Sequence, residues 1–190
     1  MELRNRHAPA VVCAGMNEEH VSLRPMAETD LPHFLSLLND PAVMGEHLWF
    51  GWRQPDRIRR VWAENGLLTD EQWTLAITAD GEFCGYAAAM REGASPAAAY
   101  WNMGAQLLPG ARGRGIGTRA HRLFADYLFA HSPVMRLEAE TEVTNVAEQR
   151  VLEKVGFTRE GVQRAQAFRD GEWRDVVLYG LLRTDPRLAL

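Results

Sequence analysis

The stretch that decides the fold is Ala111-Arg112-Gly113-Arg114-Gly115-Ile116-Gly117-Thr118. It follows an extended apolar segment and opens an amphipathic one, so it predicts a glycine-rich loop that leads into the N-terminus of a helix. Closely spaced glycines let a backbone turn tightly with its N–H groups on one concave side, and a helix N-terminus adds unpaired donors and the positive end of its dipole. The stretch therefore predicts a phosphate-binding loop, to which Arg112 and Arg114 would add two charges.

Upstream of this loop the sequence predicts one strand, two helices and three further strands. Thr29 or Asp30 is the expected cap of the first helix and Asp40-Pro41 its end, while Gly66 marks the end of the second. Asp80-Gly81 suits the two positive-φ positions of a tight hairpin. The expected strands cover residues 21–25, 72–78, 82–90 and 100–108, and the second helix covers about 55–68.

Downstream of the loop the sequence predicts a helix, a strand, a short helix and a hairpin. Asn145 is the expected cap of the short helix, which runs through Lys154, and Gly156 stands where a left-handed C-terminal residue belongs. The hairpin strands, 161–168 and 172–182, flank Asp170-Gly171. The strand 137–143 alternates apolar residues with Glu138, Glu140 and Glu142. The helix behind the loop carries an apolar stripe made of Ile116, Ala120, Leu123, Phe124, Tyr127 and Leu128.

The whole chain is predicted to form one domain, residues 21–190, behind a flexible tail, residues 1–20, that is a candidate for contact with a second copy. At 190 residues it can bury a sizeable core, and its net charge of −4 without a basic arm argues against a nucleic-acid partner. Cys13 and Cys84 share no metal or redox spacing, so reduced thiols in a cytoplasm are expected. The apolar stretch 8–16 is too short to span a bilayer, and neither a membrane partner nor a metal is expected.

Two common nucleotide loops fit the glycine pattern poorly. A dinucleotide-binding unit places its loop after the first strand and continues with parallel strands, whereas here three strands come shortly before the loop, two of them in a hairpin. A Walker loop ends in lysine followed by serine or threonine, and Gly117-Thr118 lacks the lysine. The pyrophosphate of coenzyme A is the better occupant.

The element order and two motifs carry a resemblance to a known family. Arg112-x-x-Gly115-x-Gly117, and Asn145-x-Ala147 followed by Leu152-Glu153-Lys154-Val155-Gly156-Phe157, resemble the GNAT superfamily of acyl-CoA-dependent N-acyltransferases over residues 21–183. Leu23-Arg24-Pro25, the helix residues 150–154 and Gly171-Glu172-Trp173-Arg174-Asp175 with Tyr179 are similar to the RimJ/RimL-like branch of ribosomal-protein N-terminal acetyltransferases. The resemblance implies an α+β fold with a mainly antiparallel twisted sheet, splayed at its centre and flanked by helices.

The same resemblance implies a binding site for acetyl-CoA as acyl donor. Backbone N–H groups of the glycine loop would hold the pyrophosphate, and the end of the preceding strand would bind the pantetheine arm and stabilise the oxyanion. Asn145 would contact the arm besides capping its helix. The residues given these roles are Arg112, Gly113, Arg114, Gly115, Ile116, Gly117 and Thr118 in the loop, and Gln106, Leu107 and Leu108 in the strand.

The acid–base residues are where this chain departs from the family. Leu152 stands where many members have a tyrosine that protonates the leaving thiolate, and Glu148 stands where the branch has serine. Glu148 has two interpretations: the reciprocal acid of a capping box with Asn145, or an acid–base group beside the thioester. Glu140 or Glu142 could face the acceptor. Asn102 replaces a glutamate common in the branch and could orient water or substrate, so the base stays unassigned, with a water chain as a candidate.

The acceptor site is predicted in the aromatic connection 43–52. His47, Trp49, Phe50 and Trp52 would line a pocket there, or else be core residues, and Asp175 in the last hairpin is a further substrate-binding or structural candidate. The first functional hypothesis is transfer of acetyl to a primary amine of a small molecule. The alternatives are a protein N-terminal α-amine as acceptor, a non-catalytic acyl-CoA sensor, and an acyltransferase that uses aminoacyl-tRNA.

Overall fold

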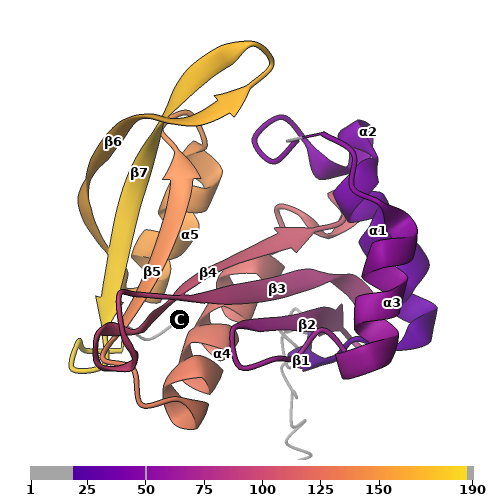
Figure 1. Ribbon diagram of the computed structural model, residues 1–190, viewed down its shortest axis with the longest axis horizontal. Helices are drawn as coiled ribbons and strands as arrows, with labels where there is room; N and C mark the ends of the chain where they lie inside the picture. Colours follow the sequence, from indigo (N-terminus) through magenta and orange to yellow (C-terminus); the bar gives the residue numbers. More distant parts are fainter. Residues whose placement is uncertain (1–18, 50, 188–190) are drawn as a thin grey trace, which may run out of the picture.

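The computed structural model describes residues 19–49 and 51–187 (Figure 1). The strands and helices follow one another in the predicted order, with one added helical turn after Asp40. The strands are β1 (Val21–Pro25), β2 (Gln72–Ala79), β3 (Glu82–Glu92), β4 (Tyr100–Leu107), β5 (Arg136–Glu142), β6 (Thr158–Arg169) and β7 (Glu172–Leu182). The helices are α1 (Leu31–Asn39), α2 (Pro41–Met44), α3 (Pro55–Asn65), α4 (Ile116–His131) and α5 (Val146–Val155), with short 3₁₀ segments at Glu28–Asp30, Pro96–Ala98 and Pro109–Ala111.

The strands form one sheet in the order β1-β2-β3-β4-β5-β7-β6. Every pairing is antiparallel except that of β4 with β5, which is parallel and covers Trp101 with Leu137 and Asn102 with Glu138. Beyond those pairs the two strands diverge, as Figure 1 shows. The predicted mixed sheet with a splay at its centre is therefore confirmed, and the splay leaves backbone groups of β4 open toward β5.

The two faces of the sheet are covered by different helices. In β2, Leu75 and Ile77 lie in the larger core cluster with Phe124 of α4, while Ala76 between them lies in a second cluster with Phe34 of α1. Successive residues of a strand point to opposite faces, so α4 and α5 pack on one face and α1 and α3 on the other. α1 and α3 thus cover only the N-terminal half of the sheet, while α4 and α5 pack on its other face on the two sides of the splay.

The predicted turns are confirmed by their backbone angles. Asp80 and Gly81 have φ of 50° and 90°, and Asp170 and Gly171 have φ of 52° and 80°, as a two-residue hairpin with both central residues left-handed requires. Gly66 and Gly156 end α3 and α5 in left-handed conformations.

Local predictions in the N-terminal half are confirmed only in part. Asp30 occupies the N-cap position of α1, but its side chain makes no capping bond to that helix: the carboxylate accepts from Arg24 at 2.5 and 2.9 Å and from the Ala27 N–H at 2.8 Å. Asp40 ends α1 but also caps α2 by accepting from the Ala42 N–H. The helix expected over 55–68 ends at Asn65.

Burial of α4 and the start of the chain also differ from expectation. Leu123 and Tyr127 are 40% and 38% exposed, so the buried stripe of α4 is narrower than predicted. At the boundary of the predicted tail, Glu19 pairs with Arg114, and the His20 N–H donates to Asp80 at 2.9 Å. Residues 1–18, including Cys13, lie outside the described residues, while Cys84 is a free and buried thiol.

Candidate active site

A cleft of about 600 Å³ opens where β4 and β5 separate. The end of β4 and the N-terminus of α4 form one side, α5 forms another, and the loop after α2 closes the third. Its lining consists of residues 44–48, 105–107, 112, 113, 115, 117, 118, 121, 145, 147, 148, 150, 151 and 154. The cleft therefore brings together the glycine loop, the open edge of β4 and the first turns of α5.

The glycine loop has the backbone geometry of an anion site. Gly113 and Gly115 have φ of 75° and 76°, the left-handed region that favours glycine. Gly115 is the N-cap of α4, and its carbonyl accepts the first helical bond, from the Arg119 N–H at 3.2 Å. Residues 116–118, between Gly115 and Arg119, have N–H groups without a partner in the helix. These free donors lie at the wall of the cleft. The phosphate-binding prediction thus rests on backbone donors.

Of the two loop arginines, Arg112 lines the cleft and keeps its charge there, whereas Arg114 is paired with a carboxylate outside the lining. The Arg112 guanidinium folds back, donating to the Leu107 carbonyl at 3.0 Å and to the Val43 carbonyl. Arg114 donates to the Gly110 carbonyl at 3.1 Å and pairs with Glu19, and it does not line the cleft. Ile116 is fully buried in the core, so only its backbone can serve a ligand.

The end of β4 presents only alternate residues to the splay. The Leu108 N–H donates to the Cys84 carbonyl of β3 at 2.8 Å, so Leu108 faces the paired edge, and Leu107 faces the opening. The Gln106 side chain also points away: its amide accepts from the Tyr86 hydroxyl at 2.9 Å and donates to the Leu37 and Met44 carbonyls. Of the predicted segment 106–108, Gln106 and Leu107 line the cleft, and the backbone of Leu107 is the part that faces the splay.

Glu148 pairs with a buried histidine that the sequence did not indicate. Its Oε1 lies 2.8 Å from Nε2 of His121, whose Nδ1 lies 2.9 Å from the Gly117 carbonyl. His121 is 1% exposed. Burial alone lowers the pKa of His121, but the Glu148 carboxylate and the Gly117 carbonyl outweigh it, so the pKa of this imidazole is raised above its ordinary value.

Asn145 caps α5 as predicted, but only half of the predicted capping box forms. Its Oδ1 accepts from the Glu148 N–H at 3.3 Å, and its Nδ2 donates to Thr141 at 2.9 Å. The Asn145 N–H donates to the Glu142 carbonyl, and the Glu148 carboxylate turns to His121. The reciprocal bond is absent from this described turn because the buried imidazole offers the carboxylate a stronger partner.

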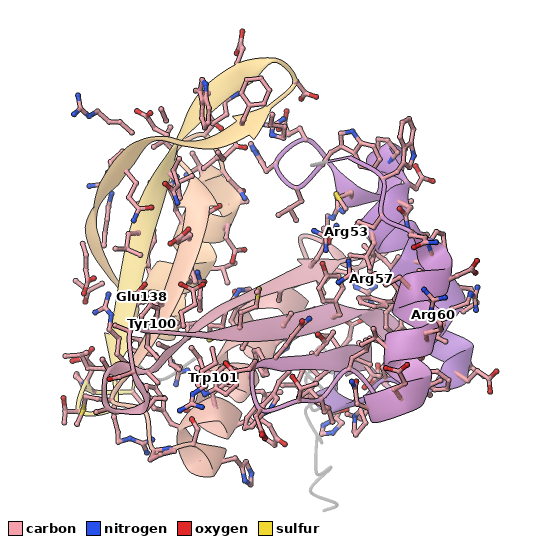
Figure 2. The ribbon with its side chains drawn as sticks, in the orientation of Figure 1. Arg53, Arg57, Arg60, Tyr100, Trp101 and Glu138 are labelled. Carbon is pink, nitrogen blue, oxygen red and sulfur yellow. The ribbon has the colours of Figure 1, made fainter. Side chains whose placement is uncertain are left out.

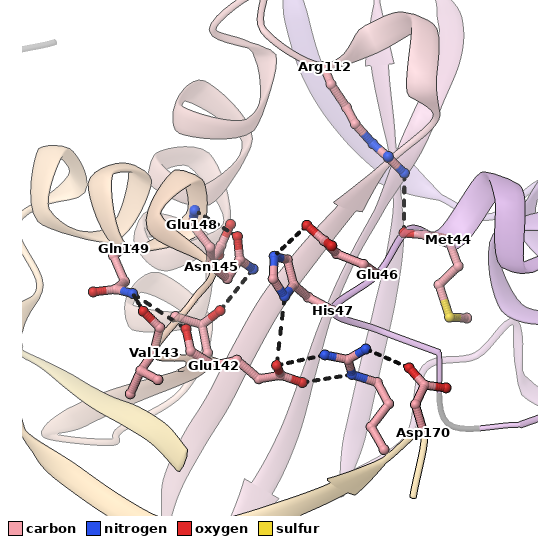
Figure 3. A network of polar contacts seen from close by, with 12 residues as sticks. Met44, Glu46, His47, Arg112, Glu142, Val143, Asn145, Glu148, Gln149 and Asp170 are labelled. Atoms are coloured by element: carbon pink, nitrogen blue, oxygen red, sulfur yellow. Dashed lines mark hydrogen bonds and ion pairs between the residues drawn. The ribbon is translucent and has the colours of Figure 1, made fainter. Parts of the chain in front are cut away.

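A second polar group crosses the mouth of the splay (Figure 3). Arg169 donates from Nε and from its terminal nitrogen to the two oxygens of Glu142, both at 2.8 Å. These bonds, against the opposing effect of burial, hold the pKa of Glu142 below its ordinary range. His47 lies next to this pair, with Nδ1 3.7 Å from Glu142 Oε2 and Nε2 3.3 Å from Glu46.

Comparison with known proteins identifies the family. A family model described as an acetyltransferase (GNAT) domain matches residues 20–158, which is most of the chain. The chain belongs to the GNAT acetyltransferase family. The curated protein named Probable N-acetyltransferase YjcK, of Bacillus subtilis (strain 168), is 40% identical over 73 residues, which are 38% of this chain and 40% of that protein. The match thus spans about two fifths of that relative.

Solved structures agree with the GNAT fold. RimL, a ribosomal alpha-N-protein acetyltransferase in complex with coenzyme A, is 20% identical with a TM-score of 0.72, covering 85% of this chain and 93% of that one. Spermidine N-acetyltransferase from Vibrio cholerae, in complex with CoA and spermine, is 16% identical with a TM-score of 0.73, covering 87% and 96%. At these identities the likeness shows the fold alone.

Two predicted catalytic residues of this GNAT domain lie outside the cleft. Asn102 donates to Glu92 at 3.3 Å, and Glu140 lies on the same sheet face, near the point where β4 and β5 pair. Burial, together with repulsion from Glu92 and Glu138, raises the pKa of Glu140. Figure 2 labels Glu138 with Tyr100 in this region. The structure therefore assembles an acidic face there, separate from the residues that line the cleft.

Of the predicted acceptor residues that the structure describes, His47 alone lines the cleft. Trp49 and Trp52 pack edge to face at 5.5 Å, Trp52 is 80% exposed, and Phe50 lies outside the described residues. Asp175 accepts from the Ala165 N–H at 2.9 Å and thereby closes a bulge in the β6–β7 hairpin. This contact agrees with the structural interpretation of Asp175.

Two side-chain pairings, Glu148 with His121 and Glu142 with Arg169, were not predicted from the sequence. His121 follows Gly117 by one helical turn on the apolar side of α4, and a lone polar residue in a buried stripe was the available signal. Arg169 and Glu142 carried no signal of pairing. Among residues 19–49 and 51–187, no His, Cys, Asp or Glu side chains form the group of three or more that a metal ion would require, and no helix there is long and apolar enough to cross a membrane.

Proposed function

We propose that this GNAT domain transfers an acetyl group from acetyl-CoA directly to a primary amine of a small molecule. The observation that carries the proposal is the single cleft that joins the N-terminus of α4, the open edge of β4 at Leu107 and the Glu148–His121 pair. The N-terminus of α4 suits a pyrophosphate, and the open edge of β4 suits an amide-bearing arm. The Glu148–His121 pair suits a leaving thiolate.

Donor binding would use the backbone at both ends of the arm. The first N–H groups of α4 would hold the pyrophosphate, and backbone groups on the open side of β4, at Leu107 and Ala105, would pair with pantetheine amides as a neighbouring strand would. Asn145 is held at both ends of its amide, and the second hydrogen of its Nδ2 is free to face the arm.

The transfer needs an oxyanion donor and a proton for sulfur. The amine nitrogen attacks the thioester carbonyl, an N–H on the open side of β4 stabilises the oxyanion, and the C–S bond then breaks with its electron pair on sulfur. The His121–Glu148 pair would hold one transferable proton, which passes through the Glu148 carboxyl to the thiolate and leaves His121 neutral. In this proposal Glu148 protonates the leaving thiolate.

The acceptor class is supported by charge. Outside the cleft lining, the sheet face beside the splay carries Glu92, Glu140 and Glu138, the last paired with Arg136 at 2.6 Å, and the net negative field favours approach of a cationic ammonium group. An acceptor with a basic amine fits that face better than an anionic one.

Thiol release from acetyl-CoA, measured across small amines, peptides with free N-termini and aminoglycosides, tests the proposal. Turnover fastest with small amines supports it, and turnover with peptides alone would replace the acceptor by a protein α-amine. No turnover with any acceptor, while acetyl-CoA still raises the melting temperature, would indicate a sensor. If neither turnover nor a thermal shift is observed, the prediction of a donor site is wrong.

A further inference from the structure

His47 occupies the one side of the cleft that the donor interactions leave unused. It stands in the loop after α2, and residues 44–48 of that loop line the cleft opposite Asn145 and Glu148. Its side chain is 21% exposed. Figure 3 shows the imidazole between Glu46 and Glu142. An acceptor amine that reaches a thioester in this cleft would pass within reach of this ring.

Glu142 is fixed in a way that suits it to orient His47. Its side chain is 5% exposed, and the guanidinium of Arg169, 8% exposed, binds both of its oxygens. The Nδ1 atom of His47 is buried without a hydrogen-bond partner and faces Glu142 Oε2 at 3.7 Å. Because Nδ1 faces this carboxylate oxygen, the tautomer with the proton on Nδ1 is favoured, and Nε2 is left as the acceptor.

The other groups near the cleft are poor acceptors for the proton of an amine. Arg169 occupies both oxygens of Glu142, which makes that carboxylate a weak base. Glu148 is engaged by His121, and Glu140 does not line the cleft. Glu46 also lines the cleft, but its side chain is 82% exposed, and its Oε1 lies 3.3 Å from His47 Nε2, between that nitrogen and solvent.

We propose that His47 Nε2 is the general base that takes the proton from the acceptor amine, with Glu142 as the positioning residue that orients its ring. The inference rests on the proposed acetyl transfer. As the new N–C bond forms, one N–H proton moves to Nε2, and the imidazolium is stabilised by Glu142. The electron pair of the C–S bond leaves with sulfur, which is protonated through Glu148, and the imidazolium returns its proton to solvent past Glu46.

The groups that face His47 and shape its pH response come from several elements. Glu46 belongs to its own loop, Glu142 to β5, Arg169 to β6, and Glu148 with His121 to the helices across the cleft. A pH profile must therefore be read together with variants.

Chemical rescue tests the base directly. The fastest acceptor in the amine panel is used with acetyl-CoA, and wild type is compared with His47→Ala and with His131→Ala, which removes an exposed histidine at the end of α4. We expect His47→Ala to lower kcat by about 100-fold, within the usual range for general bases, with little change in the KM for acetyl-CoA. Added imidazole should restore part of kcat in His47→Ala and have no effect on His131→Ala.

Glu142→Gln separates orientation from chemistry. It should lower kcat less than His47→Ala, show no imidazole rescue and shift the acidic limb of the pH–rate profile, and its melting temperature reports whether it folds. His47→Ala that keeps most of its kcat would overturn the assignment, as would a loss that imidazole does not restore and that appears mainly in the KM for acetyl-CoA. If the wild-type protein shows no turnover, the proposed acetyl transfer is wrong, and the role of His47 as its base is wrong too.

Discussion

His121 is a buried histidine whose charge is stabilised by one carboxylate. Glu148 lies 2.8 Å from its Nε2, and the pKa of His121 is raised because this contact outweighs the cost of burial. A group whose pKa is higher in the folded than in the unfolded chain stabilises the fold below its unfolded pKa, about 6.5 for histidine. That stabilisation is lost as the pH rises through the folded value.

Glu148→Gln should therefore destabilise the protein in a pH-dependent way. Below about pH 6 the wild type should exceed the variant in free energy of unfolding by its largest margin, and the margin should shrink as the pH rises through the raised pKa of His121. Urea unfolding at several values between about pH 5.5 and 9 measures it. A margin that is constant, or that grows with pH, would show that His121 is uncharged in the fold.

At the scale of elements, the ion pair of Glu142 and Arg169 ties the end of β5 to the β6–β7 hairpin. Both side chains are nearly buried, at 5% and 8% exposure. Removing one partner of such a pair leaves an uncompensated charge in the interior, whereas replacing both by apolar residues is often tolerated.

Arg169→Met should lower the free energy of unfolding by about 3–5 kcal/mol. The double variant Arg169→Met with Glu142→Leu should recover much of that loss, because no charge is then left buried. Denaturant unfolding of wild type, Arg169→Met, Glu142→Leu and the double variant completes a double-mutant cycle. Equal stabilities for wild type and Arg169→Met would mean that water reaches the pair and screens it.

The turn before α4 is the second element whose geometry matters. Gly115 has a φ of 76°, so a β-branched side chain there would force the loop out of its left-handed conformation. Gly110 lies in the same connection, and a methyl group on it would meet only open space.

Gly115→Val should weaken binding of coenzyme A by about tenfold or more, equal to about 1.4 kcal/mol. Gly110→Ala is the matched control and should bind like wild type. Isothermal titration calorimetry with coenzyme A measures both. Unchanged affinity in Gly115→Val would show that the pyrophosphate does not use the N-terminus of α4.

For the whole molecule, the cleft lies between two halves of the sheet that share only a short parallel pairing. Trp101 with Leu137 and Asn102 with Glu138 are the paired residues of β4 and β5. The loop over the cleft leaves directly from α2, and α2 is tied to the N-terminal half of the sheet because Arg112 and Gln106 donate to its Val43 and Met44 carbonyls. A ligand that bridges the splay should therefore stabilise the whole fold.

Coenzyme A at about 100 times its Kd should add about 2.7 kcal/mol to the free energy of unfolding. For a chain of this size that corresponds to a rise in Tm of roughly 5–10 °C. Scanning fluorimetry over a concentration series measures it, with adenosine as a control ligand that lacks the pyrophosphate. An unchanged Tm at millimolar coenzyme A would argue against the donor site.

Local chemistry made most elements predictable. The hairpins at Asp80-Gly81 and Asp170-Gly171 and the helix ends at Gly66 and Gly156 follow from the backbone freedom of single residues. The missed α2 shows the limit of such signals, since Asp40-Pro41 is both a helix end and a helix start. The left-handed glycines of the predicted loop likewise follow from local backbone freedom, whereas the partners of its side chains do not.

The sequence by itself determined the element order, the glycine loop and the place of Asn145 as a cap, because these depend on residues a few positions apart. Only the tertiary structure decided that Arg112 turns away from the loop, that Leu107 rather than Leu108 faces the splay, and that Glu148 meets His121. It also decided that His47 lies beside Glu142. Such contacts join elements distant in the chain, and their partners are chosen by how the sheet and helices pack.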